Sequence, residues 1–286
     1  MSQTSFTLAL PTRQTTSVVF ASPHSGRYYP PDFLTSSVLD ERTIRSSEDA
    51  FMDMLVKPAS DFGAPFIHAK YPRAYLDLNR SSDELDPAVI AGVRGTVHNP
   101  RILSGLGVIP RVVANGREIY RGKIKLREAY DRIETVWRPY HNSLENLLNS
   151  TRAQFGEAVL IDFHSMPHEA SDTISRPSFT RPEVVLGDRF GAAAAPEIVE
   201  RIENVFLAAG LKVSRNAPFA GAYIVQNYGR PSKRQHAVQV EIDRALYMNE
   251  QFVRPNTNFN AFQKLMVQIV AELADIGCKT VPLAAE

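Results

Sequence analysis

Two histidines in this sequence stand where short apolar runs end, and both are candidates for metal binding. Residues 158–167 read AVLIDFHSMP, so a continuous apolar run leads to His164. Such a run is typical of a strand buried on both faces of a sheet. A second run, residues 17–22, leads to His24. A single histidine of this kind is explained by a core partner such as Asp162, but two of them indicate a ligand site, because open α/β sheets bind ligands at strand ends.

Two histidines and one carboxylate, with a position left for water, form a catalytic rather than a structural zinc site. Glu48 and Asp49 are the candidates for the carboxylate. Both also follow the serines at 46–47, so the start of a helix explains them equally well. Glu241, at the end of a later predicted strand, is the candidate base for an activated water. Spacing alone favours a different interpretation of Glu241, an exposed charge at a strand end paired with Arg244. Spacing alone also gives weak support to the metal site, because no compact signature such as HExxH is present.

Residues 71–80, YPRAYLDLNR, interleave charged, amide and apolar side chains. Arg73, Asn79 and Arg80 are suited to hold an anion, because a guanidinium group pairs with a carboxylate through two hydrogen bonds. Asp77 could orient one of these arginines. The alternative is an edge strand whose polar side chains face water. The segment therefore predicts either an anion clamp or a solvated strand.

The elements that must position these residues alternate between strand and helix. An amphipathic pattern predicts a long helix that is kinked or divided at Pro139. Residues 81–121 predict an extended loop region with a short hairpin at residues 115–116. This alternation indicates one α/β domain, residues 1–286, with a parallel or mixed sheet. We predict strands at 17–22, 65–69, 158–164, 183–188, 211–215 and 237–242, and helices at 125–155, 192–209 and 260–276.

Composition limits the classes to which the protein can belong. The 286 residues carry a formal net charge of +1, which gives no electrostatic basis for binding nucleic acid or an anionic membrane. One cysteine, Cys278, excludes an intramolecular disulfide and a cysteine-rich zinc cluster. The amino terminus has neither a basic region nor a long apolar run, and no stretch approaches the ~18 apolar residues of a membrane span. We therefore expect a cytoplasmic protein.

Six segments of the chain carry a family resemblance: SPHSG (22–26), EDAFMDML (48–55), PRAYLDLNR (72–80), IDFHSMP (161–167), FAGAYIVQNYGRP (219–231) and VQVEIDRALYMNE (238–250). Together, and in this order, they resemble the N-formylglutamate amidohydrolase family. The likeness extends from about residue 18 to residue 250. It implies a three-layer α/β fold, with a mixed β-sheet flanked by helices, that is similar to the phosphorylase/hydrolase-like fold of zinc carboxypeptidases.

The resemblance also implies roles for the candidate residues. His24, a carboxylate of the 48–49 pair and His164 would bind Zn²⁺ or another divalent metal. Asp49 matches the family position better than Glu48. Glu241 would hold the place of the catalytic glutamate, taking a proton from water and returning it to the leaving amine.

The remaining implied roles concern the substrate. Arg73, Asn79 and Arg80 would match the clamp for the substrate carboxylate, and Arg73 or Tyr223 would help to stabilise the oxyanion. The implied reaction converts N-formyl-L-glutamate, a small-molecule partner, to formate and L-glutamate in histidine breakdown. The sequence does not indicate an oligomeric state.

Two other functions are compatible with the same residues. One is a zinc amidase that acts on another N-acyl amino acid or on a cell-wall peptide, although a secreted enzyme of that kind needs an export signal. The other is a non-catalytic protein that binds an acidic ligand, which has no need of a base beside a metal. A serine hydrolase is poorly supported, because no GxSxG sequence is present.

Overall fold

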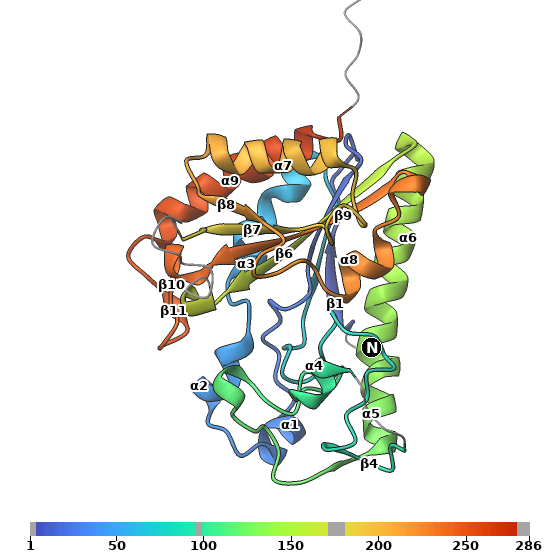
Figure 1. The fold of residues 1–286 in the computed structure, drawn as a ribbon, viewed down its shortest axis with the longest axis vertical. Helices are drawn as coiled ribbons and strands as arrows, with labels where there is room; N and C mark the ends of the chain where they lie inside the picture. Colours follow the sequence, from blue (N-terminus) through green and yellow to red (C-terminus); the bar gives the residue numbers. More distant parts are fainter. Residues whose placement is uncertain (1–3, 95–98, 171–180, 279–286) are drawn as a thin grey trace, which may run out of the picture.

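A seven-stranded mixed sheet forms the centre of the protein in the computed structural model, which describes residues 4–94, 99–170 and 181–278 (Figure 1). The strands of this sheet are β1 (Phe6–Ala9), β2 (Val18–Ser22), β3 (Phe66–Ala69), β6 (Ala158–Met166), β7 (Val184–Gly187), β8 (Val213–Arg215) and β9 (Gln235–Asp243). Their order in the sheet is β1-β3-β2-β6-β9-β7-β8. Strands β3, β2, β6 and β9 run parallel to one another, whereas β1 and β7 run antiparallel to their neighbours β3 and β9.

Helices cover both faces of this sheet, so the fold has three layers (Figure 1). The helices are α1 (Pro31–Ser36), α2 (Glu41–Ile44), α3 (Met52–Val56), α4 (Pro100–Leu103), α5 (Leu126–Arg132), α6 (Arg138–Phe155), α7 (Pro196–Ala208), α8 (Tyr223–Tyr228) and α9 (Phe259–Asp275). Helices α3, α7 and α9 pack on one face and α6 and α8 on the other. The predicted fold class, a mixed sheet flanked by helices, is confirmed.

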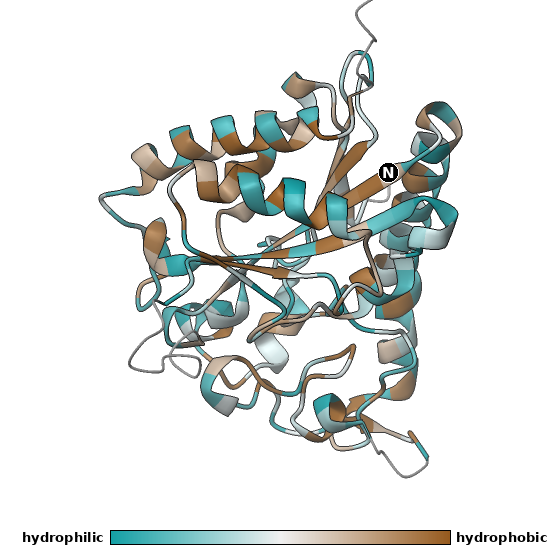
Figure 2. Ribbon diagram, turned by 45° about the horizontal axis from the view of Figure 1, so that its top comes forward, coloured by the Kyte–Doolittle hydropathy of each residue, from teal (hydrophilic) through white to brown (hydrophobic). Residues whose placement is uncertain are grey.

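The two cores are separated by the alternation of side chains along the strands. In β2, Val18 and Phe20 belong to the core under α7 and α9, whereas Val19 and Ala21 belong to the core under α6. The sheet strands are largely apolar, and the covering helices alternate between apolar and polar sides (Figure 2). Burial on both faces explains why these strands read as continuous apolar runs in the sequence.

The long helix predicted over residues 125–155 is present and is divided next to Pro139. Helix α5 passes through a π-helical turn, residues 133–137, into α6. A proline cannot donate a backbone hydrogen bond to the preceding turn, and its ring crowds the carbonyl there. The α-helix is therefore interrupted next to Pro139, as predicted, although the chain stays helical through the π-helical turn. None of the described helices is long and apolar enough to cross a membrane.

Of the predicted loop region, the described residues 81–94 and 99–121 are mostly irregular, as predicted, and they lie with α1 and α2 below the sheet in Figure 1. The predicted hairpin is present, since an antiparallel bridge joins Val112 to Glu118. Asn115 and Gly116 at its tip have φ values of 60° and 68°, in the left-handed region that these residue types tolerate. The described residues also form two short strand pairs: β4 (Ile90–Ala91) with β5 (Ile124–Lys125), and β10 (Met248–Asn249) with β11 (Arg254–Pro255).

The helix expected to begin after the serines at 46–47 does not form there, so this prediction is wrong. Those serines close a short 3-10 turn, and Glu48 is extended with a ψ of 144°. Helix α3 begins only at Met52. The backbone N–H of Asp49 donates to the carbonyl of His24 across 3.1 Å. This long-range bond ties the segment to the turn after β2 in place of a local helix cap.

Candidate metal and active site

Parallel strands carry the candidate residues to one edge of the sheet. On the neighbouring strands β6 and β9, the register pairs His164 with Glu241 and Asp162 with Gln239. Because side chains alternate along a strand, these four project from the same face. His24 follows β2, the other neighbour of β6. Strand β6 continues to Met166, so His164 lies inside the strand and not at its end as predicted.

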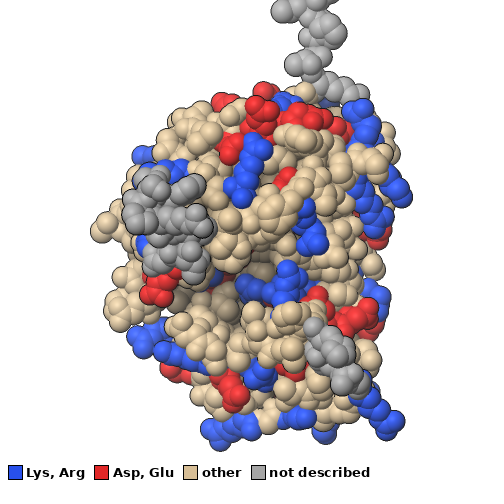
Figure 3. All heavy atoms as spheres, in the orientation of Figure 1, with Lys and Arg blue, Asp and Glu red and all other residues tan. Residues whose placement is uncertain are grey.

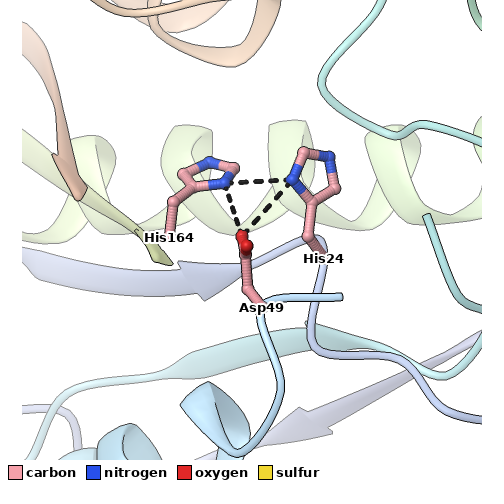
Figure 4. Close-up of side chains that lie close together, drawn as sticks. All are labelled: His24, Asp49 and His164. Atoms are coloured by element: carbon pink, nitrogen blue, oxygen red, sulfur yellow. Dashed lines mark hydrogen bonds and ion pairs between the residues drawn. The ribbon is translucent and has the colours of Figure 1, made fainter. Parts of the chain in front are cut away.

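Asp49 brings a carboxylate oxygen to both histidines (Figure 4). The Nδ1 atoms of His24 and His164 are 3.1 Å apart, and Asp49 Oδ2 lies 3.1 Å from Nδ1 of His164 and 3.5 Å from Nδ1 of His24. All three side chains are buried. Ligand atoms at about 2.0–2.2 Å from a tetrahedral zinc ion lie roughly 3.3–3.6 Å from one another, so this donor set fits one ion. Among the described residues, no second group of three such ligands converges in this way.

Each histidine ring has a carboxylate at its other nitrogen. Asp77 Oδ1 lies 2.7 Å from Nε2 of His24, and Asp162 Oδ2 lies 2.9 Å from Nε2 of His164. A ring that donates its Nε2–H to a carboxylate presents an unprotonated Nδ1, with a lone pair, toward the other ligand atoms. Histidines that bind metals commonly have such an outer carboxylate, which fixes the tautomer and increases basicity. Two lone pairs that face each other at 3.1 Å repel, and a cation between them removes that repulsion.

The two neighbouring acidic residues of the 48–49 pair point in different directions. The carboxylate of Glu48 accepts hydrogen bonds from Nε and Nη2 of Arg45 and from the hydroxyl of Tyr29. Burial and the adjacent Glu48 charge raise the pKa of the Tyr29 hydroxyl, which therefore stays protonated as a donor. Asp49 alone faces the histidines. The geometry thus favours Asp49 over Glu48 as a ligand.

Glu241 is buried beside this cluster and is held by an amide. Gln239 Nε2 donates to Glu241 Oε1 across 2.8 Å, and Gln239 Oε1 accepts from Nδ2 of Asn79 at 3.2 Å. Burial raises the pKa of Glu241 to about 7. The interpretation of Glu241 as an exposed charge paired with Arg244 is wrong, because Glu241 is only 8% exposed and Arg244 donates to Asp49.

A cavity of about 370 Å³ opens next to Glu241, and this face of the molecule is hollowed near its middle (Figure 3). The carboxyl end of β6 and the 104–116 segment form two of its walls. Among the described residues, Arg73 and Arg244 contribute its basic side chains. A larger groove of about 670 Å³ lies between α7 and α9 and contains none of the candidate residues, so volume alone does not identify the site.

The residues of the predicted anion clamp are placed differently from one another. Arg73 donates from Nε to Asp77 Oδ2 across 2.9 Å, and neither of its terminal nitrogens has a hydrogen bond to the described residues. Arg80 is buried and donates to the carbonyls of Leu106 and Asn79. Only Arg73 of this group lines the cavity. Asp77 orients Arg73, as the sequence suggested, and the segment is a series of buried turns and not a solvated edge strand.

Asn79 and Tyr223, the other predicted substrate contacts, do not line this cavity either. The carbonyl oxygen of the Asn79 side chain accepts from the backbone N–H of Ile224 across 2.8 Å. The Tyr223 ring packs against Trp137 and His141. His141 is buried nearby, and its ring nitrogens bond the hydroxyl of Tyr228 and the carbonyl of Leu78.

Among the described residues, four that contact the three candidate metal ligands were not assigned to the site from the sequence. Asp77 and Asp162 orient the histidines, and Ser165 and Arg244 contact Asp49 Oδ1. One of the four carried a usable signal, since Asp162 stands two positions before His164 on a strand and must share its face. The other contacts join residues far apart in the chain, for which spacing carries no information.

The chain is similar to known proteins over most of its length. Residues 16–248 match the family model described as N-formylglutamate amidohydrolase. A Pseudomonas putida protein named N-formylglutamate deformylase is 31% identical over 239 residues, which cover 82% of each chain. A protein of the same name from Pseudomonas aeruginosa is 30% identical over 241 residues, 82% of this chain and 83% of the other. The crystal structure of N-formylglutamate amidohydrolase from Ralstonia eutropha JMP134 superposes with a TM-score of 0.89 at 32% identity, covering 96% of this chain and 99% of that chain.

Proposed function

Because the chain belongs to the N-formylglutamate amidohydrolase family, we propose that it hydrolyses N-formyl-L-glutamate to formate and L-glutamate with a zinc ion held by His24, Asp49 and His164. The observation that carries this proposal is the convergence of three buried ligand atoms, two of them on histidines with outer carboxylates, beside a buried glutamate and a cavity. The relatives named as deformylases support the substrate.

The donor set fits zinc, because two histidines and one carboxylate leave room for water at a catalytic site. When bound, zinc would supply Lewis acidity that lowers the pKa of a water molecule towards ~7 and polarises an acyl oxygen. Other divalent metals also bind imidazole and carboxylate ligands. The choice of zinc as the bound ion is therefore part of the proposal.

Glu241 is the proposed base. Its carboxylate takes a proton from the attacking water while the new C–O bond forms at the formyl carbon. The same proton then passes to the amide nitrogen as the C–N bond breaks, and L-glutamate leaves with a neutral amine. Gln239 holds the Glu241 carboxylate in place through this transfer. Because Glu241 is buried, bulk water has little access to its carboxylate. The carboxylate can therefore keep the proton that it takes from the attacking water until the leaving amine accepts it.

Arg73 is the proposed contact for a substrate carboxylate. Its Nε is fixed by Asp77, and its two terminal nitrogens are available at the wall of the cavity that Glu241 also lines. A planar guanidinium group held in this way binds a carboxylate through two hydrogen bonds. Such a contact positions the amide for attack and favours an acidic amino acid. With these products, the reaction would serve histidine breakdown.

A release assay over N-formyl, N-acetyl and N-succinyl amino acids, with and without a chelator, tests the proposal. We expect N-formyl-L-glutamate to be the preferred substrate and the chelator to abolish turnover. Preference for another acyl group, or for a cell-wall peptide, would assign the chain to a related amidase. Turnover that survives complete removal of metal would contradict the metal-dependent mechanism.

Metal content tests the ligand set separately. We expect His24→Ala and His164→Ala each to lose the metal that the wild-type protein retains after dialysis, because each removes one of three protein ligands. The matched control is His141→Gln, which changes a buried histidine outside the cluster. Stoichiometric zinc in both alanine variants would rule out the ligand assignment.

A further inference from the structure

The two oxygens of the Asp49 carboxylate have different surroundings. Oδ2 faces the two histidines. Oδ1 accepts one hydrogen bond from the hydroxyl of Ser165 at 3.2 Å and another from Nη2 of Arg244 at 3.1 Å. The lone pairs of Oδ1 are therefore used by the protein, and those of Oδ2 are directed to the cluster.

Arg244 is itself held by every nitrogen of its guanidinium group. Nε donates to the hydroxyl of Ser165 at 3.0 Å, Nη1 donates to the carbonyl of Ser46 at 3.3 Å, and Nη2 donates to Asp49. The residue begins the 3-10 turn Arg244–Leu246 directly after β9, and it is only 6% exposed. A buried arginine with three fixed donors has little freedom to turn toward another partner.

This arrangement joins three parts of the chain at one oxygen atom. Ser165 belongs to β6, Arg244 follows β9, and Asp49 lies in the segment before α3. A carboxylate without these hydrogen bonds can bind a cation through both oxygens, or rotate so that neither oxygen is well placed as a ligand. Here the hydrogen bonds from Ser165 and Arg244 fix the rotation of the Asp49 carboxylate and keep Oδ1 from binding the cation.

We infer that Arg244 and Ser165 are positioning residues that make Asp49 a ligand through a single oxygen, Oδ2. The inference rests on the proposed function only in that Asp49 binds the metal. Residues that orient a metal ligand typically change metal affinity by about 10- to 100-fold when they are replaced. Neither residue is required to touch the substrate for this role.

Cobalt(II), added alone to metal-free protein, provides the test. Its dissociation constant is measured by competition with a chelator, and its visible absorption spectrum reports the number and arrangement of the ligands. We expect Arg244→Gln and Ser165→Ala each to weaken binding, by about 10- to 100-fold for the arginine, and to alter the spectrum. Arg244→Lys should recover part of the affinity, since an ammonium group can bond Asp49 but cannot also reach Ser165 and Ser46.

Arg45→Gln is the matched control, because it removes an arginine from the neighbouring carboxylate, Glu48. It should leave the dissociation constant and the spectrum unchanged. Wild-type affinity and spectrum in folded Arg244→Gln and Ser165→Ala would overturn the inference. If Arg244→Gln does not fold, Ser165→Ala decides, since it removes one hydroxyl only.

The same experiment separates this inference from the proposed function. If the wild-type protein binds cobalt no better than His164→Ala, the metal site itself is misplaced. If the wild-type protein binds cobalt at this site but does not hydrolyse N-formyl-L-glutamate, the reaction is wrong and the role of Arg244 stands.

Discussion

Replacing Arg73 by lysine should remove the preference for an acidic substrate, and replacing Arg80 should not. Arg73 lines the cavity and has two terminal nitrogens without partners among the described residues. Lysine carries the charge but neither the planar fork nor the Nε that Asp77 fixes. Arg80 is buried and bonded to the carbonyls of Leu106 and Asn79, so its loss affects the fold of the segment and not the cavity.

The expected magnitude follows from the exposure of Arg73. Truncating one partner of a buried, hydrogen-bonded charge pair costs about 2–5 kcal/mol. The Arg73 side chain is 25% exposed, so water screens it in part and the lower end of that range applies. A loss of about 2–3 kcal/mol corresponds to a decrease of roughly 30- to 160-fold in kcat/KM.

The assay compares N-formyl-L-glutamate with its α-amide and its γ-amide, for the wild-type protein, Arg73→Lys and Arg80→Lys. The wild-type protein should prefer the diacid over both amides. Arg73→Lys should lose its preference over one amide only, which identifies the carboxylate that Arg73 binds. Arg80→Lys should keep the wild-type ratios and unfold at a lower temperature. Unchanged ratios in Arg73→Lys, with normal metal content, would refute the clamp.

Three further predictions concern the base, the carboxylate ligand and a buried histidine. Glu241→Gln should keep the metal and the fold but lose about 10²-fold or more in kcat, and near-normal turnover would place the base elsewhere. Asp49→Ala should weaken metal binding more than Glu48→Ala, as measured by chelator competition, and the reverse order would move the ligand by one residue. Burial lowers the pKa of His141 to about 3, so the unfolded chain takes up this proton below about pH 6.5 and the folded protein does not. Stability should therefore fall as the pH falls from about 6.5 to about 3, and between pH 7 and 5 the wild-type protein should lose about 2 kcal/mol more unfolding free energy than His141→Gln. Parallel stability curves for the two proteins would show that His141 is not buried in the neutral form.

Much of the fold could be predicted from the sequence, because the signals are local. Strands buried on both faces require continuous apolar runs, and such runs located β2, β6 and β7. The period of an amphipathic helix located α7 and α9, and Pro139 indicated the interruption of the helix just before α6. The same logic failed after the serines at 46–47, where a backbone bond from Asp49 to His24 replaces the expected helix cap.

The candidate residues were recognisable by type and by their family resemblance, but their arrangement depends on the tertiary structure. Residue type could not show whether Glu48 or Asp49 is the ligand. The two side chains point in different directions because Glu48 bonds Arg45 and the backbone of Asp49 bonds His24 in the folded protein. Arg73 and Arg80 likewise read alike in the sequence. The structure exposes one to a cavity and buries the other against backbone carbonyls, because the walls of that cavity come from segments distant in the chain. The contacts that each site residue makes depend on segments distant in the chain, and the local spacing of residues in the sequence does not specify such contacts.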